Sequence, residues 1–156
     1  MISNSTPLIL LSKIDKLEIL KKLFNQITIP ESVKEEVLIE SKPGYIVIKK
    51  GIDDKWIKVE KPNKILDLNL GKGETEAISL ANEKKDILII DDLYAIRAAK
   101  VYNIETIRTT TLLFMALKKK IISKNESIDL LNKLIQEGYY IKPAEYATIF
   151  GKIKEL

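Results

Sequence analysis

The sequence predicts an α/β fold with a central, mainly parallel sheet flanked by helices. Short β-branched or aliphatic runs alternate with amphipathic helical patterns along all 156 residues, which is the order expected of βαβ units. Polar or acidic residues follow several of these runs. There is no internal repeat and no low-complexity segment, so we expect a single domain over residues 1–156.

Composition limits the kinds of site that the chain can build. Hydrophobic residues make up 46% and charged residues 31% of the chain, which is typical of a packed globular protein and excludes a disordered or fibrous one. With no Cys and no His, a disulfide framework and the usual zinc sites are excluded. A metal would have to bind oxygen ligands, which favours Mg²⁺ or Mn²⁺.

Charge and hydropathy bear on location and partners. The chain starts without a basic leader, and no apolar run approaches the ~20 residues that cross a bilayer. We therefore expect a cytoplasmic protein. The net charge of +4 and the pI near 9.0 are a weak indication of a polyanionic partner.

The beginning of the chain predicts a strand, two helices, a strand and a helix. A very short strand ends at Asn4. Thr6 before a proline favours a helix start, because proline in the first turn lacks an N–H that would be unpaired anyway. Apolar residues at helical spacing then predict two helices before residue 25. The β-branched run 26–29 predicts a second strand, and Pro30 opens the next helix.

The rest of the chain continues this alternation. Residues 45–52 fit a helix or a strand, and their periodicity does not decide between the two. Gly71 precedes an amphipathic helix that opens with Glu74 and Glu76. The other predicted elements are strands at 56–59, 86–90, 105–108 and 139–141, a loop or poor helix at 62–70, and helices at 94–102, 112–119, 125–135 and from 143 onward.

Acidic and polar residues gather where the predicted strands end. Asp91 and Asp92 follow an all-aliphatic strand, Asn4 follows the first strand, and three threonines at 109–111 follow a later one. The carboxyl ends of parallel strands share one edge of a sheet, where ligands bind. Carboxylates held close together raise one another's pKa unless a cation neutralises them. The pattern therefore predicts a Mg²⁺ or Mn²⁺ site and phosphodiester hydrolysis.

Each of these acids also has a purely structural explanation. Successive side chains of an extended strand point to opposite faces, so one of Asp91 and Asp92 can be a ligand while the other caps the next helix. Glu74 and Glu76 lie in a first helical turn, where acids are common for dipole reasons alone. Glu36 lies on an otherwise ordinary surface helix, where solvated carboxylates are common.

Basic and glycine-rich segments give less specific signals. The Gly-Lys-Gly turn at 71–73 is too short for a P-loop. Runs of lysine are solvated helix faces or, if they converge on the acidic edge, a surface that holds an RNA backbone by phosphate contacts. These runs are Lys21-Lys22, Lys49-Lys50, Lys84-Lys85 and Lys118-Lys119-Lys120.

Four segments, taken in order, carry a resemblance to a known family. They are Asn-Ser-Thr-Pro-Leu-Ile-Leu-Leu at 4–11, Ile-Pro-Glu-Ser-Val-Lys-Glu-Glu-Val at 29–37, Gly-Lys-Gly-Glu-Thr-Glu-Ala-Ile at 71–78 and Ile-Asp-Asp-Leu-Tyr-Ala-Ile-Arg at 90–97. Together they resemble a subgroup of PIN-domain proteins, the VapC-type ribonuclease toxins of prokaryotic toxin-antitoxin pairs and their relatives. With the closing segment at 137–143, the resemblance covers nearly the whole chain.

The resemblance implies a three-layer fold and a metal-dependent endoribonuclease that cleaves single-stranded RNA. The implied cofactor is Mg²⁺ or Mn²⁺, and the implied partners are RNA, a small antitoxin protein and a second copy of the chain in a homodimer. Matched by position, the catalytic residues are Asn4, Glu36, Glu74 and Asp91 or Asp92, with the acids as metal ligands, Glu76 as an alternative to Glu74, and Thr6 as a supporting hydroxyl residue.

The chain departs from the family pattern in two places. Asn4 stands where most active members have Asp, and an amide oxygen is a weaker, uncharged ligand; the subgroup that the chain resembles often shows Asn there. The alternative function is therefore a PIN-like module without catalysis that binds nucleic acid or a protein partner. Arg108 and the threonines at 109–111 replace a commonly glycine-containing turn, so a fourth ligand on that side is a hydroxyl or is missing.

Overall fold

A computed structural model describes residues 1–156 and confirms the predicted α/β fold. Its strands are β1 (Ile2–Ser3), β2 (Ile27–Pro30), β3 (Ile57–Glu60), β4 (Leu88–Ile89) and β5 (Thr106–Ile107). They form one all-parallel sheet in the order β3-β2-β1-β4-β5. Along the chain, β2 and β3 are added on one side of the central strand β1, and β4 and β5 are then added on its other side.

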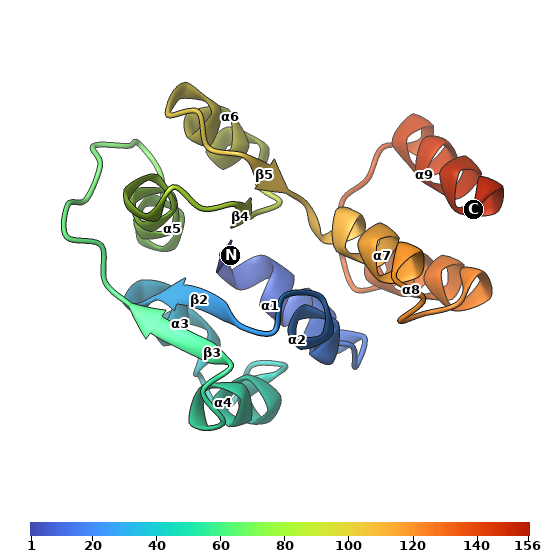
Figure 1. Cartoon of the computed structure of the whole chain (residues 1–156), viewed down its shortest axis with the longest axis horizontal. Coiled ribbons are helices and arrows are strands. Elements are labelled where there is room, and N and C mark those ends of the chain that lie inside the picture. The colour runs from blue at the N-terminus through green and yellow to red at the C-terminus, as the bar shows by residue number, and fades with distance from the viewer.

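Nine helices flank the sheet and give the three layers of a PIN-like fold (Figure 1). Their bounds are α1 (Ser5–Lys13), α2 (Glu18–Phe24), α3 (Glu31–Val37), α4 (Tyr45–Asp53), α5 (Lys72–Lys84), α6 (Leu93–Val101), α7 (Thr109–Lys118), α8 (Lys124–Gln136) and α9 (Pro143–Glu155). Figure 1 shows α7, α8 and α9 together on one side of the molecule, away from α5 and α6. None of these helices is long and apolar enough to cross a membrane.

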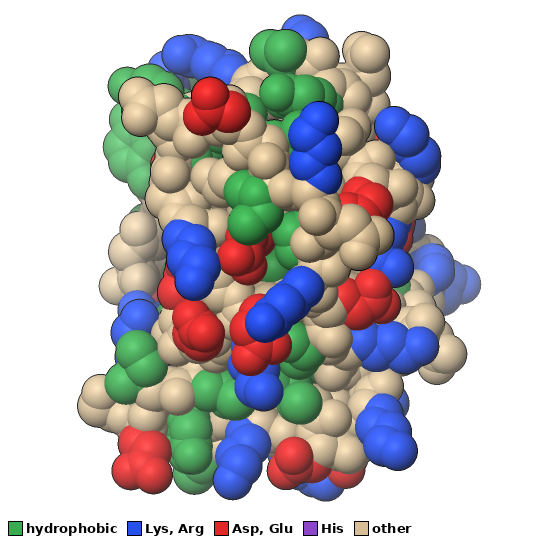
Figure 2. Space-filling model, turned by 90° about the vertical axis from the view of Figure 1, so that its left-hand side faces the viewer, with side chains coloured by type: hydrophobic (Ala, Val, Ile, Leu, Met, Phe, Trp, Pro, Cys, Tyr) green, Lys and Arg blue, Asp and Glu red, His purple; other side chains and the backbone are tan.

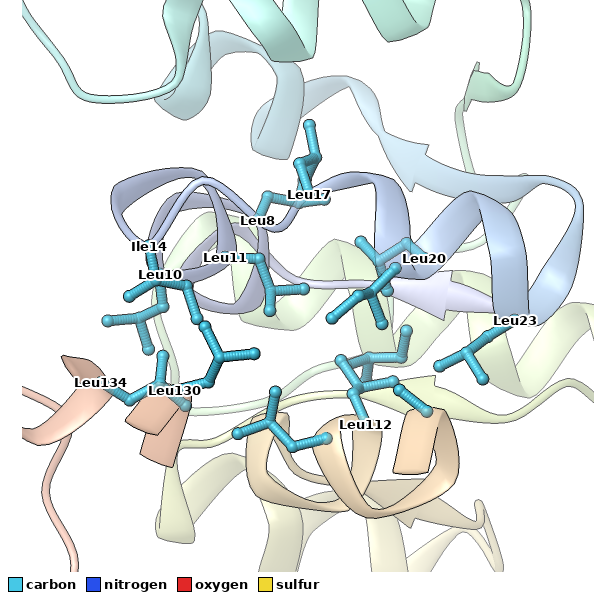
Figure 3. Packing of buried hydrophobic residues seen from close by; sticks show 14 of the residues in the cluster. Leu8, Leu10, Leu11, Ile14, Leu17, Leu20, Leu23, Leu112, Leu130 and Leu134 are labelled. Atoms are coloured by element: carbon cyan, nitrogen blue, oxygen red, sulfur yellow. The ribbon is translucent and has the colours of Figure 1, made fainter. Parts of the chain in front are cut away.

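Two hydrophobic clusters pack the two faces of the sheet. Ile2, Leu88 and Ile90 face the alanines of α5 and α6, whose small side chains let these helices lie close to the strands. Because side chains alternate along a strand, Ile29 and Ile89 point the other way into a larger cluster. There, leucines of α1 and α2 meet leucines of α7 and α8 (Figure 3).

The sheet order fixes where a ligand site can form. Strand order reverses between β1 and β4, which pair directly through Ile2 with Leu88 and Ser3 with Ile89. In open parallel sheets, ligands bind outside the carboxyl ends of the strands at this reversal point. The space outside the carboxyl ends of β1 and β4 is the crevice of this fold. Asn4, the first residue after β1, borders it on one side, and the residues after β4 border it on the other.

Most predicted elements are confirmed, and the undecided segment at 45–52 is helix α4. Ile48 and Gly51 lie on its buried face, against β3. A Cβ on Gly51 would lie 2.6 Å from Ile57 Cδ1, so glycine lets α4 pack closely against this side chain of β3. Residues 61–71 form the predicted loop before α5.

Two local predictions are wrong. Residues 139–141 form no strand, because the Tyr139 N–H donates to the Leu134 carbonyl at the end of α8 and its side chain turns into the core. The first helix begins at Ser5 instead of Thr6. The chain leaves β1 with Asn4 extended, at φ −80° and ψ 173°, which is already the conformation of an N-cap residue.

Candidate metal site

Asn4 has an unpaired side-chain oxygen directly after the central strand β1. Its backbone N–H donates to the Ile89 carbonyl at 3.0 Å, which holds the residue against β4. The side chain is only 3% exposed, and its Oδ1 accepts no hydrogen bond. A buried polar atom without a partner costs free energy. This amide oxygen is therefore available to a cation or a ligand donor.

Asp92 lies on the open side of the same crevice. It is the N-cap of α6, and its Oδ1 accepts a hydrogen bond from the Ala95 N–H at 2.8 Å. No hydrogen bond occupies its second oxygen, and the residue is exposed. Asp92 can therefore cap α6 and still offer an oxygen to a ligand.

Asp91 is held in a different way, although it is the neighbour of Asp92. Its Oδ1 accepts hydrogen bonds from the Thr109 N–H and the Tyr139 hydroxyl, both at 2.9 Å. Its Oδ2 accepts one from Thr109 Oγ1 at 2.6 Å, and Arg108 Nε lies 3.7 Å from Oδ1. With its side chain 8% exposed, Asp91 ties the start of α7 and the segment after α8 to the end of β4.

Glu36 and Glu74 each lie against a glycine at the start of α5. A Cβ on Gly73 would collide with the Glu36 carboxylate, and a Cβ on Gly71 would lie 2.6 Å from Glu74 Oε2. Each glycine therefore leaves the space that one carboxylate fills. These glycines leave room for carboxylates, and they do not form a phosphate loop.

The carboxylates of Glu36, Glu74 and Asp92 share one electrostatic environment. The pKa of Glu74 is raised above its ordinary value, first by burial and then by the negative charges of Asp92 and Glu36. These three acids come from α3, α5 and the N-cap of α6. The chain therefore brings like charges from distant segments to one place, where a cation would stabilise them.

Glu76 lies away from this group. Its Oε2 accepts a hydrogen bond at 3.2 Å from the Ser32 N–H in the first turn of α3, and its side chain is buried. It therefore joins α5 to the N-terminus of α3, where a negative charge is also favoured by the helix dipole. Thr6 is exposed and lines a hollow next to Asp91 and Asp92.

Comparisons with known proteins agree with this architecture. The family described as DUF3368: PIN domain matches residues 1–155. The chain belongs to this PIN-domain family. A solved PilT N-terminus domain protein from the hyperthermophilic archaeon Sulfolobus solfataricus P2 is similar at 26% identity and a TM-score of 0.51, over 75% of this chain and 94% of that one. A search of curated proteins finds no match.

Membership in the PIN family gives the general class of activity. PIN domains are generally nucleases that use divalent metal ions. The oxygen donors of Asn4, Glu36, Glu74 and Asp92 suit Mg²⁺ or Mn²⁺ by their chemistry. No three acidic side chains lie close enough together to hold a metal ion between them. Of these residues, Glu74 and Asp92 line the same hollow.

Sequence reasoning missed the anchor that fixes Asp91. Arg108 Nη1 donates to Glu145 Oε1 at 2.8 Å, and its guanidinium lies 5.4 Å from the centre of the Tyr139 ring. The pKa of Tyr139 is raised, first by burial and then by the charge of Asp91, so its hydroxyl stays a donor. The position of Arg108 directly after the last strand was the available signal, but Tyr139 and Glu145 follow 31 or more residues later.

The lysine runs of this PIN domain do not converge on the acidic edge. Three of them end α2, α4 and α5 just before the amino-terminal ends of β2, β3 and β4. The fourth ends α7, where Lys119 Nζ donates to the Leu23 carbonyl of α2. On the face in Figure 2, basic side chains are scattered among acidic ones. The runs are therefore solvated helix ends on the opposite edge of the sheet.

Proposed function

We propose that this PIN domain is a Mg²⁺- or Mn²⁺-dependent endoribonuclease that cleaves single-stranded RNA. The observation that carries the proposal is that Glu74 and Asp92 line one hollow, with the Glu36 carboxylate against Gly73 at the start of the same helix, α5. The raised pKa of Glu74, which the charges of Asp92 and Glu36 help to cause, agrees with this placement. The negative charges of Asp92 and Glu36 near Glu74 destabilise the metal-free chain. Binding a divalent ion is the function that offsets that cost.

In this proposal Glu36, Glu74 and Asp92 hold the ion, and the Asn4 amide oxygen completes the set. When bound, such an ion polarises a phosphodiester and orients a water for attack. Asp91 is a positioning residue, because it fixes the end of β4 through Thr109 and so directs the next residue into the crevice. Glu76 has the same role for α3 and α5, which carry Glu36 and Glu74.

The cellular role that we propose is that of the toxin in a two-gene module, neutralised by a small antitoxin protein, with the toxin acting as a homodimer. Its support is the resemblance of segments 4–11, 29–37, 71–78 and 90–97 to VapC-type toxins. Expression of the chain alone should then stop growth, and co-expression of the protein encoded by an adjacent short reading frame should restore it.

The direct test is cleavage of a labelled single-stranded RNA in Mg²⁺, in Mn²⁺ and with a chelator. We expect cleavage only with the metals, and a loss of more than about 100-fold in Asp92→Asn, because a direct ligand should matter more than residues that merely orient ligands. Asparagine still caps α6, so folding is preserved. The matched control is Asp129→Asn on the exposed face of α8, which should cleave like wild type.

One observation favours a second candidate, a PIN domain that binds without cleaving. Asn4 supplies an uncharged oxygen directly after the central strand β1, which weakens metal binding relative to a carboxylate. An inert wild type whose Asn4→Asp variant gains metal-dependent cleavage would favour this candidate. Unchanged cleavage in Asp92→Asn would instead remove the assignment of the metal site.

A further inference from the structure

The crevice continues past Asp92 into a hollow that the metal-dependent chemistry does not use. Its volume is about 540 Å³, within the ~300–1,000 Å³ range of small-molecule sites. The lining combines aromatic, basic and acidic side chains, including Thr6, Asp92, Tyr94, Arg108, Tyr140 and Lys142. It is large enough for a single nucleotide and too small for a duplex.

Two tyrosines on the wall of this hollow are unusually exposed. Tyr94 in the first turn of α6 is 72% exposed, and Tyr140 in the segment between α8 and α9 is 71% exposed. Neither side chain donates or accepts a hydrogen bond within the chain. The Arg97 guanidinium lies 5.9 Å from the centre of the Tyr94 ring, so Tyr94 offers the face away from Arg97 and Tyr140 offers its whole ring. Such aromatic faces are stacking surfaces for unpaired bases.

The cations near Asp92 are in the same hollow. Arg108 is paired with Glu145 and Asp91 and its side chain stays 23% exposed, whereas Lys142 is exposed and forms no ion pair. Because the lysine runs lie at the opposite edge of the sheet, these two residues are well placed to meet phosphates next to Asp92. A base on a tyrosine and a phosphate on a cation are the two contacts that a single-stranded nucleotide needs.

A second hollow of about 440 Å³ lies on the other side of Tyr94 and is lined by Glu74, Leu68 and Ala98. Asp92 and Tyr94 line both hollows. A strand that occupies both must therefore cross Asp92, with one nucleotide on each side. This order would place the phosphodiester bond between the two nucleotides next to Asp92.

We propose that the hollow lined by Tyr94 and Tyr140 is a nucleobase subsite, which stacks one unpaired base of the RNA while Lys142 and Arg108 contact its phosphates. The proposal rests on the proposed nuclease function, but it concerns binding and not the metal. Stacking tolerates any base, since every base has a π-face. The subsite therefore selects for an unpaired strand and gives little sequence preference.

The test is equilibrium binding of two short labelled RNA strands of equal length, one with all its bases and one with an abasic nucleotide at its centre. A chelator is present, so no cleavage occurs. We expect the wild type to bind the complete strand about tenfold more tightly. Tyr140→Ala and Tyr94→Ala should each reduce this ratio toward one, whereas Tyr140→Phe should preserve it because the ring remains.

Two control variants separate stacking from other effects. Tyr102→Ala changes a tyrosine that lines a different hollow at the opposite edge of the sheet, and should leave the ratio unchanged. Lys142→Gln should weaken both strands alike and lower the salt dependence of binding. Thermal melting of each variant shows whether it is folded.

The outcomes distinguish this proposal from the nuclease proposal. Base-dependent binding that needs Tyr140, without cleavage in Mg²⁺ or Mn²⁺, would keep the subsite and remove the nuclease. Metal-dependent cleavage with equal binding of both strands would keep the nuclease and overturn the subsite. Absence of RNA binding would also overturn the subsite. A Tyr140→Ala variant that binds both strands like wild type but changes the oligomeric state would overturn it too, and would indicate a contact between proteins.

Discussion

In each of the two acidic pairs of this PIN domain, Asp91 with Asp92 and Glu74 with Glu76, the two residues make different contacts. In the pair Asp91-Asp92, the first residue is buried with both oxygens hydrogen-bonded, whereas the second is exposed with one oxygen free. In the pair Glu74 and Glu76, the second accepts a hydrogen bond from the Ser32 N–H, whereas the first faces other carboxylates. Each pair thus contains one residue that holds the fold and one that faces the crevice.

This division shows how a crevice can hold like charges in place. A carboxylate that keeps an oxygen free has few contacts of its own, so neighbouring residues must help to set its position. Asp91 supplies that support for Asp92 by joining β4 to α7 and to the segment before α9. Glu76 supplies it for Glu36 and Glu74 by joining α3 to α5. The buried acid of each pair therefore stabilises the geometry, and the open acid is the one that we propose as a metal ligand.

The largest expected effect on stability comes from Asp91→Ala. The substitution leaves the Thr109 N–H, the Thr109 hydroxyl and the Tyr139 hydroxyl without their acceptor and Arg108 without one of its acids. We expect a loss of about 3 kcal/mol in the free energy of unfolding. Urea unfolding followed by circular dichroism measures it.

The neighbouring variant sharpens the same comparison. Asp92→Ala removes one N-cap hydrogen bond to the Ala95 N–H and should cost only about 1 kcal/mol. If Asp92→Ala destabilises the chain as much as Asp91→Ala, then Asp92 holds the fold as much as Asp91 does, and the difference in their contacts does not reflect different roles.

The glutamate pair should give a smaller contrast. Glu76→Ala leaves the buried Ser32 N–H unpaired at the start of α3, which should cost about 2 kcal/mol in unfolding free energy. Glu76→Gln keeps an acceptor and should cost less than half as much. Metal-dependent cleavage should survive in Glu76→Gln and be lost in Glu74→Gln. The reverse pattern would exchange the roles of the two glutamates.

The fold could be predicted from the sequence because its signals are local. Aliphatic runs such as 86–90 and helical spacing of apolar residues report on the element in which they lie. Residues 139–141 look like a strand by the same criterion, yet the Tyr139 side chain is drawn into the core and bonded to Asp91. That contact spans 48 positions, and no local pattern contains it.

The site could be predicted only as far as a set of residue types at strand ends. The sequence names Asp91 and Asp92 but cannot choose between them, because the choice depends on Thr109 and Tyr139, which are distant in the chain. For the glutamates, the choice depends on which one meets the Ser32 N–H. The tyrosines of the proposed subsite gave no signal, because exposure of a side chain is a property of the folded surface.

The smallest expected effect is also the most specific, and it concerns Glu74→Gln in the absence of metal. The folded-state pKa of Glu74 is raised above its ordinary value of 4.5 by burial and by the charges of Asp92 and Glu36. An acid with a raised pKa binds its proton more tightly in the folded state, so the stability of the wild type falls as pH rises through the window between the two pKa values. Glutamine has no charge to repel, so at pH 7 the variant should be more stable.

The expected gain is less than about 1 kcal/mol, or about 2–4 °C at most in Tm, because water screens a partly exposed carboxylate. Lowering the pH to about 4 should remove the gain, since Glu74 is then protonated in the wild type as well. Glu35→Gln on the outer face of α3 is the matched control and should change Tm little at either pH. Added Mn²⁺ should raise the Tm of wild type more than that of Glu74→Gln. A variant that is less stable than wild type at pH 7 without metal would mean that Glu74 is held by favourable contacts, and that Asp92 and Glu36 do not strain it.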